Sequence, residues 1–245
     1  MPQATRTKKP DVKVVILGDM NVGKTSLLHR YTERKFKDTI STVGGAFFLK
    51  QWGPYNISIW DTAGREQFHG LGSMYCRGAA AVILTYDVTN WQSLAELENR
   101  FLSLTDTANT DCIFAIVGNK TDLTEAHAQG PDTKSEHKEE AQAVITCPSP
   151  PAVPLQHKQV SREDAFALYG RVLRYKGLEE KACLPAERVC FETSAKTGYN
   201  VDVLFETLFD LVLPSILKKR SEGESSTVDL ETPMEAKRIK AGCCV

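Results

Sequence analysis

Residues 12–25 read VKVVILGDMNVGKT, in which an apolar run passes directly into the glycine-framed loop Gly18 to Thr25. Two glycines with four residues between them, followed by lysine and threonine, are typical of a phosphate-binding loop between a strand and a helix. Glycine lets successive backbone N–H groups turn inward around an anion, and the following helix points the positive end of its dipole at that anion. The stretch therefore predicts an α/β fold with a phosphate site at the end of its first strand.

Lys24 and Thr25 supply the charge and the hydroxyl of this loop. We expect the Lys24 ammonium to reach the outer phosphates of a nucleotide and the Thr25 hydroxyl to ligate Mg²⁺. We assign the whole segment to nucleotide binding, namely Gly18, Asp19, Met20, Asn21, Val22, Gly23, Lys24, Thr25 and Ser26. The loop by itself leaves the choice between ATP and GTP open.

The motif NKTD at 119–122, which follows the apolar run 112–118, selects the base. The Asp122 carboxylate can accept two hydrogen bonds from N–H groups of guanine, a donor pair that adenine does not offer. With adenine this buried carboxylate would stay unpaired, at a cost of roughly 1–3 kcal/mol. We expect Asn119 to brace the neighbouring loops and to reach the ring, and the Lys120 stem to lie along the base.

A further motif, SAK, occupies Ser194, Ala195 and Lys196. We assign all three residues to nucleotide binding and expect the Ala195 backbone N–H to donate to the guanine keto oxygen. NKTD or SAK alone occurs often by chance in ordinary loops. Their order after the first loop and after DTAG at 61–64 predicts a guanine-nucleotide switch.

Alternating strand and helix patterns run through the rest of the chain. Apolar runs predict strands at 12–17, 46–52, 55–60, 80–87, 112–118 and 188–193. Helical spacing predicts helices at 24–34, about 91–104, 161–174 and 201–217. Gly53-Pro54 signals a hairpin, which places one antiparallel strand in a mostly parallel, six-stranded sheet with helices on both faces. In such a sheet the loops at the carboxyl ends of the strands bind the ligand.

The domain organisation predicted from composition is one globular unit with appendages. Residues 1–10 are expected to be flexible, 11–217 to form the globular domain, and 218–245 to form a variable polar tail. Residues 125–159 form a polar, proline-containing stretch without a periodic apolar face, which predicts a disordered insertion.

Charge and cysteine usage narrow the class. The chain has 245 residues with a formal net charge of -1, so it carries no basic footprint for nucleic acid. It has seven cysteines, some of them inside apolar runs, and no secretory segment before Val12, which together predict reduced thiols in the cytosol. Cys112 and Cys190 are interpreted as small core residues. The wide spacing of His127, His137, Cys147 and His157 favours solvated loop residues over a metal site.

These motifs resemble the Ras superfamily and, within it, the Rab small GTPases. The Rab-like wording includes WDTAG from Trp60, MYCRGA at 74–79, YDVT at 86–89, ETSAK at 192–196 and the terminal cysteine pair. The resemblance covers nearly the whole chain from Val12. It implies the G-domain fold of P-loop NTPases, binding of GTP or GDP with Mg²⁺, and a GTP phosphohydrolase that acts as a monomeric switch in vesicle trafficking.

The same resemblance assigns the switch residues. Thr42 would ligate Mg²⁺ beside Thr25 and sense the γ-phosphate, Asp61 would hold the metal through water, and the Gly64 N–H would bond the γ-phosphate. Phe36 would cover the edge of the base. The aromatic triad that Rab proteins present to effectors matches Phe47, Trp60 and Tyr75, with a core role as the alternative reading of these three residues.

The end of the chain resembles a lipidation signal. Cys243 and Cys244 are the third-last and second-last residues, so a CaaX box, which needs cysteine where Gly242 stands, is excluded. The resemblance implies double geranylgeranylation, and two lipid chains anchor stably where one binds marginally. Implied partners are effectors, an exchange factor, a GTPase-activating protein, an escort protein with geranylgeranyltransferase, and a GDP-dissociation inhibitor. The implied location is the cytoplasmic face of endosomal, phagosomal or Golgi membranes, with a cytosolic pool.

Departures from the Rab pattern bear on turnover. Arg65 stands where glutamine usually orients the attacking water, and arginine only donates hydrogen bonds. We therefore expect slow hydrolysis, with Lys24, Thr42, Arg65 and Gln67 as the candidate catalytic set. Two functions stay open: a slowly cycling GTPase, or a platform that holds GTP permanently and binds effectors. An ATP-dependent small-molecule kinase is disfavoured by Asp122. Met20 would either crowd the γ-phosphate or point to solvent.

Overall fold

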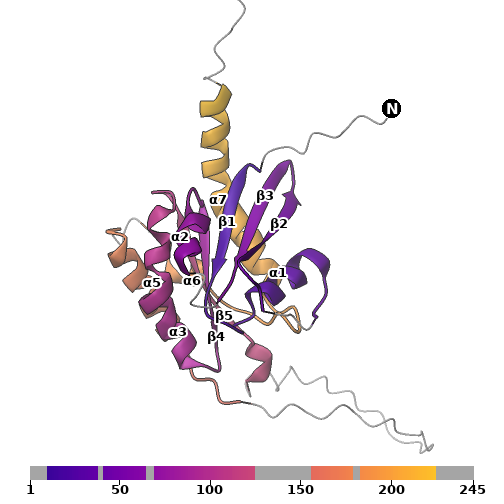
Figure 1. The fold of residues 1–245 in the computed structure, drawn as a ribbon, viewed down its shortest axis with the longest axis vertical. Helices are drawn as coiled ribbons and strands as arrows, with labels where there is room; N and C mark the ends of the chain where they lie inside the picture. The colour runs from indigo at the N-terminus through magenta and orange to yellow at the C-terminus, as the bar shows by residue number, and fades with distance from the viewer. Residues whose placement is uncertain (1–9, 38–40, 65–68, 125–155, 179–182, 225–245) are drawn as a thin grey trace, which may run out of the picture.

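The computed structural model describes residues 10–37, 41–64, 69–124, 156–178 and 183–224. Its centre is a six-stranded sheet in the order β2-β3-β1-β4-β5-β6 (Figure 1). The strands are β1 (Val12–Leu17), β2 (Gly45–Trp52), β3 (Tyr55–Thr62), β4 (Ala81–Asp87), β5 (Ile113–Asn119) and β6 (Cys190–Glu192). Among the strands of the described residues, only β2 and β3 pair antiparallel. The predicted mostly parallel α/β sheet with one antiparallel strand is confirmed.

Helices cover both faces of this sheet, as predicted. The α-helices are α1 (Lys24–Glu33), α2 (His69–Cys76), α3 (Trp91–Glu96), α5 (Arg162–Tyr175), α6 (Ala186–Val189) and α7 (Val201–Glu224). Figure 1 shows α1 and α7 on one side of the sheet, and α3 and α5 on the other. Each side has its own buried apolar cluster, and the alternating residues of β1 feed both, with Val14 and Ile16 on the α1 side and Val15 and Leu17 on the α5 side.

Local sequence signals explain where helices begin. The Ser161 side chain accepts from the Asp164 N–H at 3.1 Å, while the Asp164 carboxylate accepts from the Ser161 N–H at 2.8 Å, a reciprocal capping box at the start of α5. At the start of α3, the Asn90 side chain accepts from the Gln92 N–H at 3.0 Å. Both caps satisfy N–H groups that a helix leaves without partners in its first turn.

Three predicted element boundaries are wrong. The helix expected at 91–104 is an α-helix only to Glu96, and then becomes a π turn (Leu97–Phe101) and a 3-10 turn (Ser103–Thr107). The expected boundary between 217 and 218 falls inside α7, which runs on to Glu224. An established helix adds one hydrogen bond per residue without needing burial, so it outlasts the apolar stripe used to place its end. The third is the start of the strand expected at 188–193, which begins only at Cys190 because Ala186–Val189 form the helix α6. The short helices α2 and α6 were not predicted, since neither has a periodic apolar stripe.

The two ends of the predicted insertion lie side by side. Thr124 and Gln156 form a bridge, and the Gln156 N–H donates to the Leu123 carbonyl at 2.8 Å. The Gln159 N–H donates to the Val88 carbonyl at 2.9 Å. Residues 156–159, placed in the insertion by sequence, are therefore bonded to the body of the domain. Residues 125–155 lie outside the described residues, as do residues 1–9 of the expected flexible N-terminus and most of the expected tail.

Cys112 and Cys190 are buried, as expected of small core residues. Burial raises the pKa of the Cys190 thiol to about 12, so it stays protonated at neutral pH. Within the described ranges, no three His, Cys, Asp or Glu side chains are grouped to hold a metal ion. No helix in this part of the chain combines the length and apolarity needed to cross a membrane.

Candidate nucleotide site

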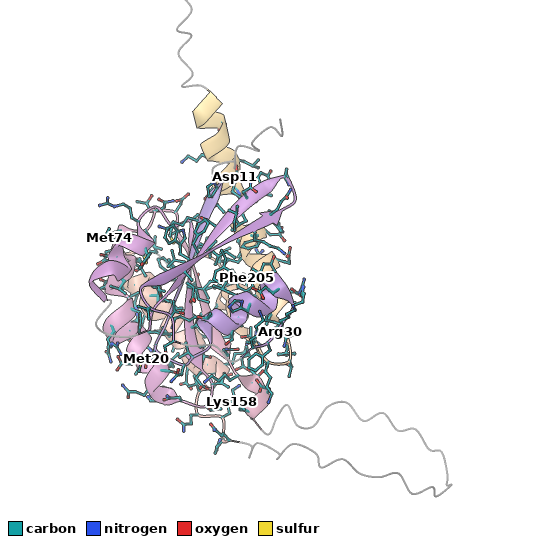
Figure 2. All side chains as sticks on the ribbon, turned by 45° about the vertical axis from the view of Figure 1, so that its right-hand side comes forward. Asp11, Met20, Arg30, Met74, Lys158 and Phe205 are labelled. Carbon is teal, nitrogen blue, oxygen red and sulfur yellow. The ribbon has the colours of Figure 1, made fainter. Side chains whose placement is uncertain are left out.

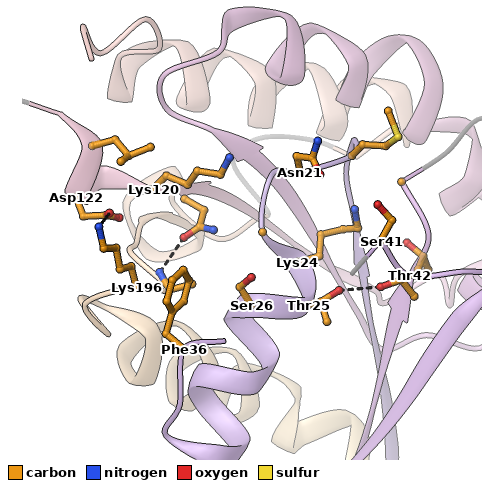
Figure 3. A pocket seen from close by; sticks show the side chains of 17 residues that line it. Asn21, Lys24, Thr25, Ser26, Phe36, Ser41, Thr42, Lys120, Asp122 and Lys196 are labelled. Carbon is orange, nitrogen blue, oxygen red and sulfur yellow. Dashed lines mark hydrogen bonds and ion pairs between the residues drawn. The ribbon is translucent and has the colours of Figure 1, made fainter. Parts of the chain in front are cut away.

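A cavity of about 360 Å³ opens beyond the ends of β1, β3 and β5 (Figure 3). Of the residues predicted from sequence, it is lined by Met20, Asn21, Gly23, Lys24, Thr25, Ser26, Phe36, Thr42, Gly64, Asn119, Lys120, Asp122, Ala195 and Lys196. The structure thus brings the four sequence motifs and both expected switch loops to one cavity. Figure 3 shows Asp122 and Lys196 at one end of it and Thr25 and Thr42 at the other.

The loop after β1 needs its two framing glycines for different contacts. Gly18 has φ 146°, and a Cβ there would lie 2.2 Å from the Thr85 carbonyl oxygen. Gly23 has φ 96°, and its Cβ would lie 2.3 Å from Asn119 Nδ2. Between them, Asn21 adopts a left-handed backbone with φ 60°, a conformation that asparagine tolerates better than most residues. The loop is therefore packed tightly against β4 and the NKTD segment.

Lys24 is a buried cation whose partners are neutral. Its Nζ donates to the carbonyls of Gly18 and Asp19, each at 2.8 Å, and the side chain is 6% exposed. Burial lowers the pKa of Lys24 to about 8, against the opposing pull of the Asp61 and Asp19 carboxylates. An anion in the cavity would supply the charge that these carbonyls lack.

Three oxygens converge beneath the cavity. Thr25 Oγ1 donates to Asp61 Oδ2 at 2.5 Å, Thr42 Oγ1 donates to the same oxygen at 3.1 Å, and the two hydroxyls are 2.9 Å apart. Mg²⁺ binds oxygens octahedrally at 2.0–2.1 Å, so neighbouring ligands lie about 2.9 Å apart, and this cluster fits such an ion.

The buried state of Asp61 points the same way. Its Oδ1 has no hydrogen-bond partner among the described residues, and the residue is 1% exposed. Burial raises the pKa of the Asp61 carboxyl, against hydrogen bonds from Thr25 and Thr42 and the charge of Lys24. A buried carboxylate with an unused oxygen is stabilised by a cation or by the water around one.

At the end of the cavity expected to hold the base, Asp122 is oriented by the SAK loop. Ser194 Oγ donates to Asp122 Oδ1 at 2.6 Å, and Lys196 Nζ lies 3.9 Å from Asp122 Oδ2. Asn119 Nδ2 donates to the Val22 carbonyl at 2.9 Å, the bracing role predicted for it. The Ala195 N–H, expected to be directed at a guanine keto oxygen, instead donates to Asn119 Oδ1 at 3.0 Å. The sequence gives no warning of this competing acceptor on a neighbouring loop.

Lys120 gains a partner that sequence reasoning missed. Its Nζ lies 2.7 Å from Asp87 Oδ2, and its backbone has φ 70°. Asp87 ends β4 within the YDVT stretch, so the adjacency of β4 and β5 was the only available signal. The cavity also gains lining residues that were not predicted, namely Ser41, Thr62 and Leu123.

The second switch segment meets the first loop closely at Gly64. A Cβ on Gly64 would lie 2.5 Å from the Met20 N atom, so only glycine fits there without a shift. Met20 lines the cavity and is 47% exposed, which combines both readings of this residue. The candidate catalytic residues Arg65 and Gln67 lie outside the described residues.

The predicted effector-facing aromatics form one continuous row. The Phe47 and Trp60 ring centroids are 5.2 Å apart, and those of Trp60 and Tyr75 are 5.7 Å apart. Phe47 is 50% exposed, whereas Trp60 and Tyr75 pack partly against the buried cluster. Lys13 Nζ lies 4.6 Å above the Trp60 ring. The core reading therefore holds in part for Trp60 and Tyr75 and not for Phe47.

Comparisons with known proteins identify the family of the chain. The model of the Ras family matches residues 13–213. The chain is 64% identical over 237 residues to Ras-related protein Rab-20 of Homo sapiens, covering 97% of this chain and 99% of that protein. It is 63% identical to Ras-related protein Rab-20 of Mus musculus, and 42% identical over 118 residues, 46% of the chain and 59% of the relative, to Ras-related protein Rab5 of Nicotiana tabacum. The chain therefore belongs to the Rab small GTPases of the Ras family.

Proposed function

We propose that this chain binds GTP and GDP with Mg²⁺ in the cavity between the four motifs, and acts as a membrane-anchored switch in vesicle trafficking with slow hydrolysis. Rab GTPases are GTP hydrolases as a family. The single observation that carries the assignment is that both sets of residues line one cavity: Asp122, held by Ser194, lies at one end, and Lys24 with Thr25 lies at the other.

Each end performs a separate task. Lys24 and the N-terminus of α1 bind the phosphate chain, and Asp122 accepts from guanine N–H groups. Thr25, Thr42 and Asp61 would hold Mg²⁺ directly or through water. Bound Mg²⁺ would neutralise charge on the outer phosphates. Because Thr42 and Gly64 belong to the switch segments, loss of the γ-phosphate would remove their bonds to it and relax both segments.

The slow turnover rests on Arg65. Its guanidinium cannot accept a hydrogen bond from an attacking water, which the usual glutamine does. Lys24 and Thr42 still support the transferred phosphate, and Gln67 is the alternative residue for orienting water. The second candidate function, a platform that is GTP-loaded most of the time, follows if Arg65 makes turnover negligible.

Anchoring and partners complete the proposal. Cys243 and Cys244 would each carry a geranylgeranyl group, which is added with the help of an escort protein. A GDP-dissociation inhibitor would extract the lipidated protein from membranes. Phe47, with the partly buried Trp60 and Tyr75 behind it, offers an exposed aromatic surface to effectors. An exchange factor and a GTPase-activating protein would set the cycle at endosomal, phagosomal or Golgi membranes.

Nucleotide competition tests the core of this proposal. Purified full-length protein is loaded with a fluorescent GDP analogue in Mg²⁺, and release is followed on adding excess GDP, GTP or ATP. We expect GDP and GTP to displace the probe and ATP to leave it bound. Equal displacement by ATP would contradict guanine selection by Asp122.

The choice between the two functions needs the nucleotide carried in cells. The bound GTP:GDP ratio of the isolated protein is compared with that of Arg65→Gln. A mainly GTP-bound wild-type chain, with a ratio shifted toward GDP in the variant, supports slow turnover through Arg65. Equal ratios would remove Arg65 from the account.

A further inference from the structure

We infer that Arg30 is a positioning residue for guanine recognition, because it orients the SAK loop that presents both a backbone donor and Asp122 to the base. This inference rests on the guanine binding proposed above. Arg30 lies in α1, the helix that begins with Lys24 and Thr25 at the phosphate end (Figure 2). It does not line the cavity, and none of the sequence motifs includes it.

The guanidinium of Arg30 donates hydrogen bonds to two successive carbonyls of the SAK loop. Nε donates to the Ala195 carbonyl at 2.7 Å, and Nη2 donates to the Lys196 carbonyl. The stem of the side chain packs beside Gly198, where a Cβ would lie 3.6 Å from Arg30 Cδ. These contacts join residues 165 and 166 positions apart, so α1 and the SAK loop are tied directly together.

The hydrogen bond from Arg30 to the Ala195 carbonyl sets the direction of the next backbone N–H, that of Lys196. The carbonyl of Ala195 and the N–H of Lys196 belong to one peptide group, and in a trans peptide they point in opposite directions. With the carbonyl turned outward to Arg30, the Lys196 N–H is directed to the opposite side of the loop, where Ala195 and Lys196 line the cavity. Since the Ala195 N–H is bonded to Asn119, Lys196 supplies the donor suited to the guanine keto oxygen.

The hydrogen bond from Arg30 to the Lys196 carbonyl continues as a series of hydrogen bonds that ends at Asp122. The Lys196 carbonyl shares its peptide with the Thr197 N–H, which donates to Ser194 Oγ at 3.1 Å. The Ser194 hydroxyl in turn donates to Asp122 Oδ1 at 2.6 Å. Hydrogen bonds in such a series polarise one another, and each fixes the orientation of the next group. Arg30 thus supports the carboxylate that selects guanine without touching the base.

Arginine suits this role better than lysine. Its planar fork can donate to two neighbouring carbonyls at once, whereas a lysine ammonium is a single point on a flexible stem. A third donor, Nη1, reaches the Arg34 carbonyl at the end of α1 at 3.4 Å. The phosphate end and the base end of the cavity therefore share one rigid element, α1.

The test compares nucleotides that lack one guanine contact each. Dissociation constants for GDP, 6-thio-GDP and IDP are measured on the full chain with Mg²⁺ for wild type, Arg30→Met and Arg30→Lys. 6-Thio-GDP weakens the acceptor at position 6, and IDP lacks the 2-amino donor that faces Asp122. Arg34→Met is the matched control, because Arg34 pairs with Asp202 on the surface, with both side chains more than half exposed.

We expect Arg30→Met to weaken GDP binding about tenfold, the equivalent of one charge-assisted hydrogen bond. The decisive readout is the ratio between nucleotides. Wild type and Arg34→Met should show the same loss of affinity when GDP is replaced by 6-thio-GDP or by IDP. Arg30→Met should show a smaller loss with both analogues, because its contacts to the base are already weak and less affinity remains to be lost when the base is altered. Arg30→Lys should fall between them.

Unchanged ratios in Arg30→Met, with or without weaker GDP binding, would overturn the inference and leave guanine binding intact. If Arg30→Met does not fold, Arg30→Lys decides by the same ratios, because a lysine carries all its donors on one atom and cannot reproduce the separate Nε and Nη2 bonds of Arg30. Failure of the proposed function itself is recognised separately, in wild type alone, by equal binding of GDP and ADP.

Discussion

The Thr25 hydroxyl donates to Asp61 Oδ2 across 2.5 Å, and the Thr42 hydroxyl lies 2.9 Å from that of Thr25. Thr25 and Thr42 both line the cavity. The hydrogen bond from Thr25 to Asp61 brings the proposed Mg²⁺ ligand of the phosphate loop and that of the DTAG motif to one point. Burial raises the pKa of the Asp61 carboxyl, and the hydrogen bonds from Thr25 and Thr42 and the charge of Lys24 offset this only in part. A cation bound at this point would stabilise the charged form of Asp61.

Asp61→Asn should have opposite effects in the absence and in the presence of the metal: it should stabilise the metal-free protein and weaken Mg²⁺ binding. The folded-state pKa of Asp61 lies above the ordinary value, so its charged form costs stability in metal-free protein once the pH exceeds that pKa. We expect the variant to melt higher than wild type at neutral pH in excess chelator. We expect its affinity for Mg²⁺ in the GDP complex to fall by about 10–100-fold.

Thermal melts with chelator or with Mg²⁺·GDP, and Mg²⁺ titrations, measure these effects. Asp111→Asn, at an exposed carboxylate, is the control and should change neither quantity. A variant that melts lower than wild type in chelator would show that Asp61 stabilises the fold without a metal.

Lys24 should take up a proton when nucleotide binds in mildly alkaline solution. In the empty cavity its pKa is about 8, below the ordinary 10.5, and a phosphate anion would raise it again. Between these two values the bound form holds more protons than the free form, so GDP affinity should decline as the pH rises through this window. Calorimetry near pH 9 in two buffers of different ionisation enthalpy should show proton uptake, and the uptake should vanish near pH 6.5. Equal binding heats in both buffers at both pH values would contradict it.

Gly118 is required by its neighbour Tyr86. A Cβ at Gly118 would lie 2.6 Å from Tyr86 Oη and 2.7 Å from its Cζ. We expect Gly118→Ala to lower the free energy of unfolding by about 1–3 kcal/mol through overpacking. Tyr86→Phe is the informative companion, since Oη has no hydrogen-bond partner within the described part of the chain and its removal should change stability by less than about 1 kcal/mol. Urea denaturation of GDP-loaded protein measures both; a Gly118→Ala variant as stable as wild type would mean that Tyr86 moves away at no cost.

The sequence predicted the fold and the cavity where signals were local. The apolar run 12–17 and the framing glycines specify strand, turn and helix within one short segment, and the structure places β1 at those same residues. The motifs at 119–122 and 194–196 follow strands, and parallel strands bring such loops to one edge. The adjacency of these strands in the sheet then brings the motifs together around one cavity.

What escaped prediction depends on partners distant in sequence. Arg30 binds backbone carbonyls, which every residue possesses, so no side-chain pattern marks their position. The Ala195 N–H turned to Asn119 because two loops approach each other, which neither motif encodes. The π turn at Leu97–Phe101 kept the apolar spacing of an α-helix, so periodicity could not reveal the change of hydrogen bonding.

Phe47 and Trp60 should separate binding from stability. Trp60 packs partly on the buried cluster between Phe47 and Tyr75, so Trp60→Ala should lower the free energy of unfolding by about 3 kcal/mol. Phe47 is 50% exposed, and Phe47→Ala should cost less than about 1 kcal/mol. Denaturation of both variants in Mg²⁺·GDP gives the comparison. Equal losses would mean that Phe47 is a structural residue, and would remove it as a site for testing effector contact.

Replacing residues 125–155 by a short Gly-Ser linker should leave the domain folded and its affinity for GDP unchanged. The reason is the contact between the two ends: Thr124 and Gln156 form a bridge, and the Gln156 N–H donates to the Leu123 carbonyl at 2.8 Å. A short connection can therefore span this gap, and closing a shorter loop costs less entropy, which raises the free energy of unfolding by up to about 2 kcal/mol. The bonds of Gln159 and Val160 to the Val88 carbonyl stay in place, and with them the register that leads into α5. Denaturation and GDP titration of the shortened chain measure the outcome, and Gln159→Ala is the companion variant, because it removes the side-chain acceptor of the Trp91 N–H, at 3.0 Å, on the same segment. A shortened chain that loses GDP affinity while Gln159→Ala retains it would assign to residues 125–155 a direct part in nucleotide binding, since Leu123 and Asp122 lie next to their point of departure on the rim of the cavity.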